Sequence, residues 1–146
     1  MRPIISICIP TYNRAEYLKE CLNSIVFQLN KNINQQIEII ISDNHSQDQT
    51  KNIVKNYQKK YKNIRYFRNQ KNIGAAKNAI RALNHVTGSY IWFFSDDDLH
   101  KRGSLATVLS VISKHTPEAI LCNLNLYSKN AKNLLDPNLL RINRRD

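Results

Sequence analysis

The sequence predicts an α/β fold in which a mostly parallel sheet carries helices on both of its faces. Short, continuous apolar segments alternate along the chain with segments whose apolar residues recur at helical spacing. Continuous apolar strands are typical of parallel sheets that are covered on both sides. Polar residues follow each of the first four predicted strands, and in such sheets ligands bind outside the carboxyl ends of the strands.

Five short apolar segments are predicted to be strands. IISICIP, IEIIIS and IRYFR are rich in β-branched residues, YIWFF adds aromatic residues after Gly88, and AILCNLNL is the last candidate. We expect YIWFF to be a buried strand, because all five of its residues are bulky and apolar. The predicted strands cover residues 4–10, 37–42, 64–68, 90–94 and 119–126.

Four segments between these strands are predicted to be helices. Asn13 is a suitable N-cap for the first helix and Ser46 for the second, and Glu16 and Gln49 stand in the capping-box positions. Gly74 opens the third helix, and the polar segment 30–36 is predicted to be a loop. The predicted helices cover residues 15–29, 47–60, 75–86 and 104–114.

Composition and charge bound the classes of function. The 146 residues carry a formal charge of +11, which favours polyanionic partners, but the basic residues are scattered and no nucleic-acid-binding motif is present. No apolar run is long enough to span a membrane, no signal peptide is evident, and the three cysteines lack disulfide or metal spacing. We therefore expect a cytoplasmic protein. The basic end, with Arg141, Arg144 and Arg145, is either a frayed terminus or a contact for anionic lipid at the inner face of the membrane.

The most informative segment is the acidic triplet Asp96-Asp97-Asp98, which directly follows the aromatic strand. Three adjacent carboxylates repel one another, so we expect a positive partner nearby. Carboxylates at Asp96 and Asp98 could hold Mg²⁺ or Mn²⁺ against a diphosphate. Asp43, after the second strand, could accept a hydrogen bond from a nucleotide base or ribose, and Gly74 could let the next helix N-terminus approach a phosphate.

Four motifs in this order resemble those of the family 2 glycosyltransferases, which have the GT-A fold: SICIPTYNR, EIIISDNHSQDQT, NIGAAKNAI and YIWFFSDDDL. The resemblance covers residues 4–103. It implies transfer of a sugar from a nucleotide diphosphosugar to an acceptor hydroxyl, usually with inversion, in bacterial surface polysaccharide synthesis. The implied partners are a UDP-sugar by default and a saccharide or lipid-linked saccharide acceptor, with no nucleic acid.

The resemblance also implies roles for individual residues. The acidic triplet is the DxD-type motif, in which Asp98, helped by Asp96, binds Mn²⁺ or Mg²⁺ and Asp97 contacts the ribose or diphosphate. Lys77 stands where the family more often has Arg, and Ser95 stands where it more often has Asp. The residues expected to bind the nucleotide are Thr11, Tyr12, Asn13, Arg14, Asp43, Asn44, Asn72, Gly74, Lys77 and Asp97.

The catalytic base is the main departure from the family pattern. Inversion needs a general base to deprotonate the acceptor, and in this family the base lies well beyond the DxD-type motif. Glu118 and Asp136 follow the triplet here, but neither is a good candidate, so the catalytic residue is not assigned. We predict a nucleotide-sugar-binding domain over residues 1–126 and an irregular basic tail over 127–146 that begins a truncated acceptor-binding region.

Three other functions stay open at this point. A nucleotide-sugar-binding module without catalysis fits the absence of a base. A nucleic-acid-binding protein would need only the positive charge and would not depend on Asp98. A nucleotidyltransferase would ordinarily carry a glycine-rich loop after the first strand, where this chain has Pro10-Thr11-Tyr12-Asn13.

Overall fold

The computed structural model describes residues 2–122, 126–127 and 134–136. The chain divides into two compact units, Met1–Lys114 and His115–Asp146, which are described separately. The predicted boundary at residue 126 stays a prediction.

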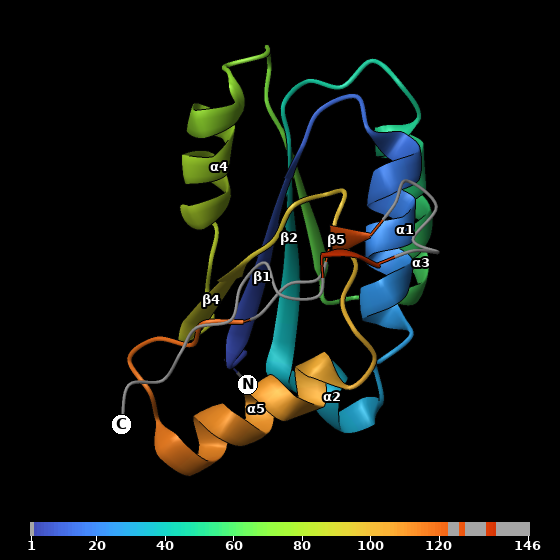
Figure 1. The fold of residues 1–146 in the computed structure, drawn as a ribbon. Helices are drawn as coiled ribbons and strands as arrows, with labels where there is room; N and C mark the ends of the chain where they lie inside the picture. The colour runs from blue at the N-terminus through green and yellow to red at the C-terminus, as the bar shows by residue number, and fades with distance from the viewer. Residues whose placement is uncertain (1, 123–125, 128–133, 137–146) are drawn as a thin grey trace. The chain divides into compact units, whose positions relative to one another are not determined.

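A four-stranded, fully parallel sheet forms the centre of the first unit (Figure 1). Its order is β3-β2-β1-β4, so the first two strands of the chain are central and the last one lies at an edge. Register pairs Thr11 with Asp43 and Asp43 with Arg68, which brings the carboxyl ends of three strands to one level. The strands are β1 (Ile5–Thr11), β2 (Ile37–Asp43), β3 (Ile64–Arg68) and β4 (Tyr90–Phe93).

Helices cover both faces of this sheet, as predicted. In Figure 1, α1 and α3 lie on one face, α4 lies on the other, and α2 and α5 lie at the amino ends of the strands. The helices in the described part of the chain are α1 (Ala15–Val26), α2 (Lys31–Gln36), α3 (Thr50–Lys60), α4 (Ala75–Leu83) and α5 (Ser104–His115). None of them is long and apolar enough to cross a membrane.

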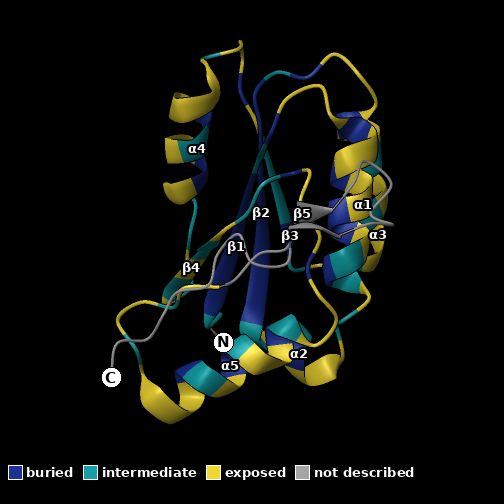
Figure 2. Cartoon of the chain, in the orientation of Figure 1, coloured by how far each residue is buried: buried dark blue, intermediate teal, exposed yellow. Residues whose placement is uncertain are grey.

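The core is built from alternate residues of the two central strands. Cys8 and Ile40 are fully buried and cluster with Ala82 of α4. Ile7, Ile39 and the other odd-numbered residues of these two strands are also buried. They point to the face that α1 and α3 cover, because side chains alternate along a strand. Figure 2 shows β1 and β2 as the most continuously buried part of the chain. Burying each such isoleucine stabilises the fold by about 1.5–3 kcal/mol.

The prediction of a loop over residues 30–36 was wrong, because α2 begins at Lys31. Asn30 is its N-cap, and the side chain of Asn30 accepts a hydrogen bond from the Ile33 amide at 2.9 Å. Ile33 is buried, so this short helix combines a cap with one apolar anchor. The helix before it ends at Val26, three residues earlier than predicted.

The predicted N-caps of the first two long helices were also wrong. α1 begins at Ala15 and α3 at Thr50, and neither has a side-chain cap from its N-cap residue. Asn13 and Ser46 instead take part in hydrogen bonds that join the two loops to each other. Asp48 supplies the acceptor for both helix starts, with its two oxygens 2.9 Å from the Ala15 amide and 3.0 Å from the Thr50 amide.

The expectation that the aromatic segment is a buried strand was wrong, because none of its five residues is fully buried. β4 is an edge strand, and the side chains of Ile91 and Phe93 are 50% and 48% exposed. Tyr90 and Trp92 point to the opposite face and are partly buried. A run of bulky apolar residues does not distinguish a central strand from an edge strand, since only the order of the sheet decides this.

The prediction of a fifth strand over residues 119–126 was wrong for residues 119–122. Residues 119–122 are not in a strand, and residues 123–125 lie outside the described part of the chain. Instead β5 (Leu126–Tyr127) and β6 (Leu134–Asp136) pair as a separate antiparallel ladder. This pairing was not predicted, because the periodicity of that region is weak.

Gly88, which precedes β4, lies against the backbone of β1. A Cβ atom at this position would lie 2.7 Å from the Ser6 hydroxyl oxygen and 2.8 Å from the Ser6 backbone nitrogen. We therefore expect Gly88→Ala to lower the free energy of unfolding by about 1–3 kcal/mol, because the two strands must move apart. Urea unfolding beside the exposed control Ser89→Ala tests this. Equal stability of the two variants would contradict the close approach.

Candidate functional site

The loops that follow β1 and β2 are tied together by hydrogen bonds. The backbone amide of Asn13 donates to the Ser46 hydroxyl at 2.9 Å. The backbone amide of Gln47 donates to the side-chain oxygen of Asn13 at 2.7 Å. Asn13 has a left-handed backbone, with φ of 51°, which asparagine tolerates better than most residues. Two loops that are 33 residues apart thus form one rigid rim at the carboxyl ends of the central strands.

Asp43 ends β2 and lies beneath this rim with no exposed surface. It accepts hydrogen bonds from the Ser46 amide at 2.8 Å and from the Tyr66 hydroxyl, and the Arg68 guanidinium lies 3.5 Å away. Burial, followed by the Asp43 carboxylate, raises the pKa of Tyr66. A nucleotide group that binds Asp43 must therefore displace or share one of these donors.

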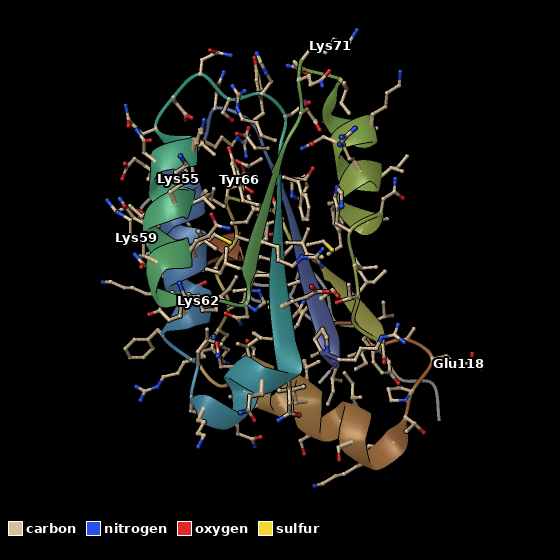
Figure 3. The ribbon with its side chains drawn as sticks, turned by 180° about the vertical axis from the view of Figure 1, so that it is seen from behind. Lys55, Lys59, Lys62, Tyr66, Lys71 and Glu118 are labelled. Carbon is tan, nitrogen blue, oxygen red and sulfur yellow. The ribbon has the colours of Figure 1, made fainter. Side chains whose placement is uncertain are left out.

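Sequence reasoning did not find Tyr66 and Arg68. Both lie on β3, and register places Arg68 beside Asp43. In Figure 3, Tyr66 is labelled between α3 and the strands, toward the carboxyl ends of the strands. The only signal available in the sequence was their spacing of two residues near the end of a predicted strand, which puts both side chains on one face.

A network of asparagine side chains positions Gly74 at the start of α4. Asn44 donates to Asn72 at 2.8 Å, and Asn72 accepts from the Gly74 amide at 2.9 Å. Asn69 donates to both Asn44 and Asn78. Gly74 has a φ of 85°, a conformation that favours glycine, and no other atom occupies the space where a Cβ would lie. The first turn of α4 is thereby held open toward the same edge of the sheet.

Arg14 is the positively charged partner that was expected beside the acidic triplet. Arg14, which follows β1, lies with Nη1 3.2 Å from Asp96 and 2.7 Å from Asp97. Asp96 is almost fully buried, whereas Asp97 is exposed and also accepts a hydrogen bond from the Ser95 hydroxyl. The Ser95 bond, followed by the charge of Arg14, lowers the pKa of Asp97 despite its partial burial.

Asp98 differs from its two neighbours because it has no ion pair with a described residue. Burial raises the pKa of Asp98, and the charges of Asp97 and Asp96 raise it further. A cation at Asp98 would relieve this repulsion. No group of three His, Cys, Asp or Glu residues surrounds a common point within the described part of the chain. A metal here would need ligands from a bound diphosphate, which is the usual arrangement for Mg²⁺ with nucleotides.

The remaining predicted residues line the same edge to different degrees. Thr11 is buried at the end of β1, and Tyr12 is 42% exposed. Asn72 and Lys77 are exposed, and Lys77 lies in the first turns of α4. The structure therefore brings the predicted residues from four strand ends to one edge, where Thr11, Asp43, Asn44 and Asp96 are buried and the others are exposed.

An aromatic cluster of Trp92, Phe94 and His100 flanks the acidic triplet in the sequence. His100 is buried, and its ring stacks on Phe94 with a centroid separation of 3.8 Å and lies 4.7 Å from Trp92. The His100 amide donates to the Ser24 hydroxyl of α1 at 2.9 Å. This cluster fixes the segment that leaves the triplet, and sequence reasoning saw no role for His100.

Burial lowers the pKa of His100 to about 4, and we expect this to make stability depend on pH. An unfolded histidine titrates near pH 6.5. Below that pH the imidazole binds a proton in the unfolded state, whereas the buried imidazole of the folded state stays neutral until about pH 4. Stability should therefore fall as the pH drops from about 6.5 to about 4, by roughly 2–3 kcal/mol from this residue. Urea unfolding at both ends of this range should show the loss in wild type and in the exposed control His115→Phe, and a smaller loss in His100→Phe. An equal loss in all three proteins would contradict the assignment.

Comparison with known proteins decides which family has this site. The family model described as glycosyl transferase family 2 matches residues 6–143. The chain belongs to glycosyl transferase family 2. The resemblance that the four motifs indicated is thereby confirmed.

Curated relatives of this family 2 chain are sugar transferases. The abequosyltransferase RfbV of Salmonella typhimurium is 40% identical over 82% of this chain and 35% of its own length. The GalNAc(5)-diNAcBac-PP-undecaprenol beta-1,3-glucosyltransferase of Campylobacter jejuni is 37% identical over 73% of this chain and 34% of its own length. The chain thus spans about a third of the length of these relatives.

Solved structures confirm the GT-A fold. TarS of S. aureus, residues 1–349, in complex with UDP-GlcNAc, superposes with a TM-score of 0.69 at 29% identity, over 80% of this chain and 32% of TarS. The mannosyltransferase PcManGT of Pyrobaculum calidifontis, in complex with GDP-Man and Mn²⁺, superposes with a TM-score of 0.66 at 25% identity, over 80% of this chain and 34% of that protein.

Proposed function

We propose that this chain is the donor-binding part of an inverting glycosyltransferase that uses a nucleotide diphosphosugar. The observation that carries the proposal is the convergence of four strand ends on one edge, where buried Asp43, the open start of α4 and the acidic triplet lie together. A nucleoside diphosphate offers complementary groups for each, namely donors from the base and ribose, phosphate oxygens, and a bound cation.

The roles follow from the position of each residue. Thr11, Tyr12, Asn13, Asp43 and Asn44 lie at the rim after β1 and β2 and would hold the base and ribose. At the α4 side, the Gly74 amide and the helix N-terminus would bind the diphosphate, together with the residues Asn72 and Lys77. Arg14 and Asp97 would orient the ribose or diphosphate from the acidic loop.

Asp98, with Asp96 as a second carboxylate, would hold Mn²⁺ or Mg²⁺. Both residues offer the hard oxygen ligands that these ions prefer, and Asp98 lacks the arginine partner that its neighbours have. The bound ion would supply Lewis-acid stabilisation of the leaving nucleoside diphosphate. Arg14 would then redistribute its hydrogen bonds, because Asp96 cannot serve both partners fully.

Whether this chain alone performs transfer is a separate matter. Within the described residues of the first unit, the carboxylates at the edge other than Asp98 are engaged by protein donors, so none is free to act as the base. Glu118 is exposed in the second unit, and the side chain of Asp136 lies outside the described part. This favours, as the alternative function of the 146 residues alone, nucleotide-sugar binding without catalysis.

The full enzyme would act on a saccharide or lipid-linked saccharide in surface polysaccharide synthesis, in the cytoplasm or at the inner face of the membrane. The Campylobacter relative, whose name includes a PP-undecaprenol acceptor, supports a lipid-linked class. The predicted lipid contact of the basic end rests on Arg141, Arg144 and Arg145, which lie outside the described residues.

Calorimetric titration of UDP, GDP, CDP and dTDP, each with Mn²⁺ and with EDTA, tests the donor site. UDP is the default expectation, supported by TarS, and GDP is the main competitor, supported by PcManGT. Mn²⁺-dependent binding of one nucleotide would support the proposal. Hydrolysis of the matching nucleotide sugar would then distinguish an active chain from a binding module. A folded chain that binds none of the four nucleotides would contradict the proposal.

A further inference from the structure

The exposed surface of α3 carries basic side chains and no acidic ones. No Asp or Glu occurs between Gln49 and Ser95, and α3 carries Lys51, Lys55 and Lys59 at intervals of four residues. Residues four apart share one face of a helix, so these lysines form a continuous stripe. All three are exposed, as is Lys62 just after the helix. Figure 3 shows Lys55 and Lys59 along α3 and Lys62 beyond its carboxyl end.

The stripe ends at a shallow hollow between α3 and α2. This hollow has a volume of about 240 Å³, and Lys31 and Lys60 contribute cationic groups to it. The other lining residues are Leu29, Asn30, Asn34 and Tyr61. No ion pair joins any lysine of the stripe or the hollow to a described carboxylate. The two features together are called the α3 basic face, defined by Lys31, Lys51, Lys55, Lys59, Lys60 and Lys62.

An exposed aromatic residue adjoins the α3 basic face. Phe27 follows α1, is 75% exposed, and has the Arg102 guanidinium 5.6 Å from its ring centroid. Only one residue separates it from Leu29 in the wall of the hollow. Basic residues beside an exposed Phe and a Leu are typical of surfaces that lie on anionic membranes, where the aromatic ring enters the boundary between head groups and acyl chains. A soluble polyanion would use the lysines but would gain nothing from Phe27.

We infer that the α3 basic face binds the surface of an anionic phospholipid membrane, with lipid head groups against the lysines and Phe27 at the acyl boundary. The inference is independent of the proposed donor site, because none of these residues belongs to it. α3 begins just after Asp48, in the loop that follows Asp43 at the carboxyl end of β2. A membrane along α3 would therefore leave the carboxyl edge of the sheet open beside the lipid, where a lipid-linked acceptor could reach it.

Co-sedimentation of the full chain with phosphatidylcholine vesicles, with and without phosphatidylglycerol, tests this inference. We expect binding only to the anionic vesicles, and loss of that binding at high salt. The triple variant Lys55→Gln, Lys59→Gln, Lys62→Gln should bind about 100-fold more weakly, at about fivefold for each lysine. The control Lys71→Gln, Arg81→Gln, Lys114→Gln removes the same charge from exposed positions elsewhere and should lose much less.

Phe27→Ser and polyphosphate distinguish a lipid surface from a soluble polyanion. Phe27→Ser should weaken binding to vesicles and leave binding to polyphosphate unchanged. Circular dichroism and thermal unfolding would show that each variant is folded. Failure to bind anionic vesicles, equal losses in the two triple variants, or an unchanged vesicle affinity of Phe27→Ser would each overturn the inference. Strong polyphosphate binding that depends on the α3 lysines, without vesicle binding, would assign the face to a soluble polyanion instead.

Discussion

Asp98→Asn is expected to weaken the Mn²⁺-dependent binding of the donor nucleotide by about 100-fold or more. Loss of a residue that only supports a metal ligand already costs 10–100-fold in affinity, and Asp98 is proposed as a direct ligand. The amide removes the negative charge but keeps the size of the side chain, so the loop should retain its shape. Calorimetry in the presence of Mn²⁺ and in EDTA measures the effect, which should be confined to the metal-dependent part of binding.

Glu20→Gln is the matched control for this variant. Glu20 is exposed on α1 and forms no ion pair with a described residue, so the same chemical change there should leave affinity unaltered. Thermal unfolding of Asp98→Asn should occur at or above the wild-type temperature, because the charge that burial and Asp97 destabilise has been removed. An Asp98→Asn protein that is folded and retains wild-type Mn²⁺-dependent affinity would remove Asp98 from the metal site.

Glu38→Ala should produce the largest loss of stability, about 3 kcal/mol. Glu38 is buried in β2 and accepts hydrogen bonds from the Ser6 hydroxyl at 2.6 Å, from Arg65 at 2.7 Å and from Thr87, whose amide is at 2.6 Å. These donors come from β1, β3 and the segment before β4, so this one carboxylate joins all four strands at their amino ends. Its removal leaves the buried Ser6 hydroxyl without its acceptor and the partly buried Arg65 without its carboxylate partner, so that Arg65 keeps only the His85 carbonyl. Urea unfolding measures the change, which is a large fraction of the 5–15 kcal/mol typical of a domain.

The pH dependence of the Glu38 contribution gives this prediction a second readout. Burial alone raises the pKa of Glu38, but the hydrogen bonds from Ser6, Arg65 and Thr87 together lower it below its ordinary value. A carboxyl whose folded pKa is depressed stabilises the fold above its unfolded pKa, and that stability is lost as the pH falls. Wild type should therefore lose more stability than Glu38→Ala in the acidic range. The exposed pair Glu16–Lys19 is the control, and a Glu16→Ala loss as large as that of Glu38→Ala would contradict the account.

The sequence was sufficient for the fold and for the sheet edge at which the candidate site is proposed. The isoleucine-rich segments that form β1 and β2 are continuous and apolar, and their ends were predicted to within a residue. The predicted burial of the segment Tyr90 to Phe94 was wrong. Its composition resembles that of a central strand, whereas β4 lies at the edge of the sheet. Burial of a strand is a property of the sheet, which a local pattern does not contain.

The individual contacts of the site could not be predicted, because they join segments that are far apart in the sequence. A positive partner for the acidic triplet was expected, but Arg14 lies 82 residues before Asp96, and its choice over the nearby Lys101 and Arg102 depends on the β1–β4 pairing. Likewise, the capping preference of Asn13 and Ser46 is local, whereas the hydrogen bond between them depends on parallel register. Residue types identified the edge, and topology decided the partners.

Paramagnetic broadening by Mn²⁺ tests the central claim most directly, because it locates the metal on the folded chain. Amide signals of the isotope-labelled chain would be recorded with the bound nucleotide and Mg²⁺, and then with a small fraction of Mn²⁺. We expect the signals of Asp96, Asp98 and Thr11 to broaden first, while those of Lys59 in α3 and Leu109 in α5 stay sharp. Broadening centred on α3 or α5, with the acidic triplet unaffected, would contradict a metal-dependent nucleotide-sugar site at the carboxyl edge of the sheet.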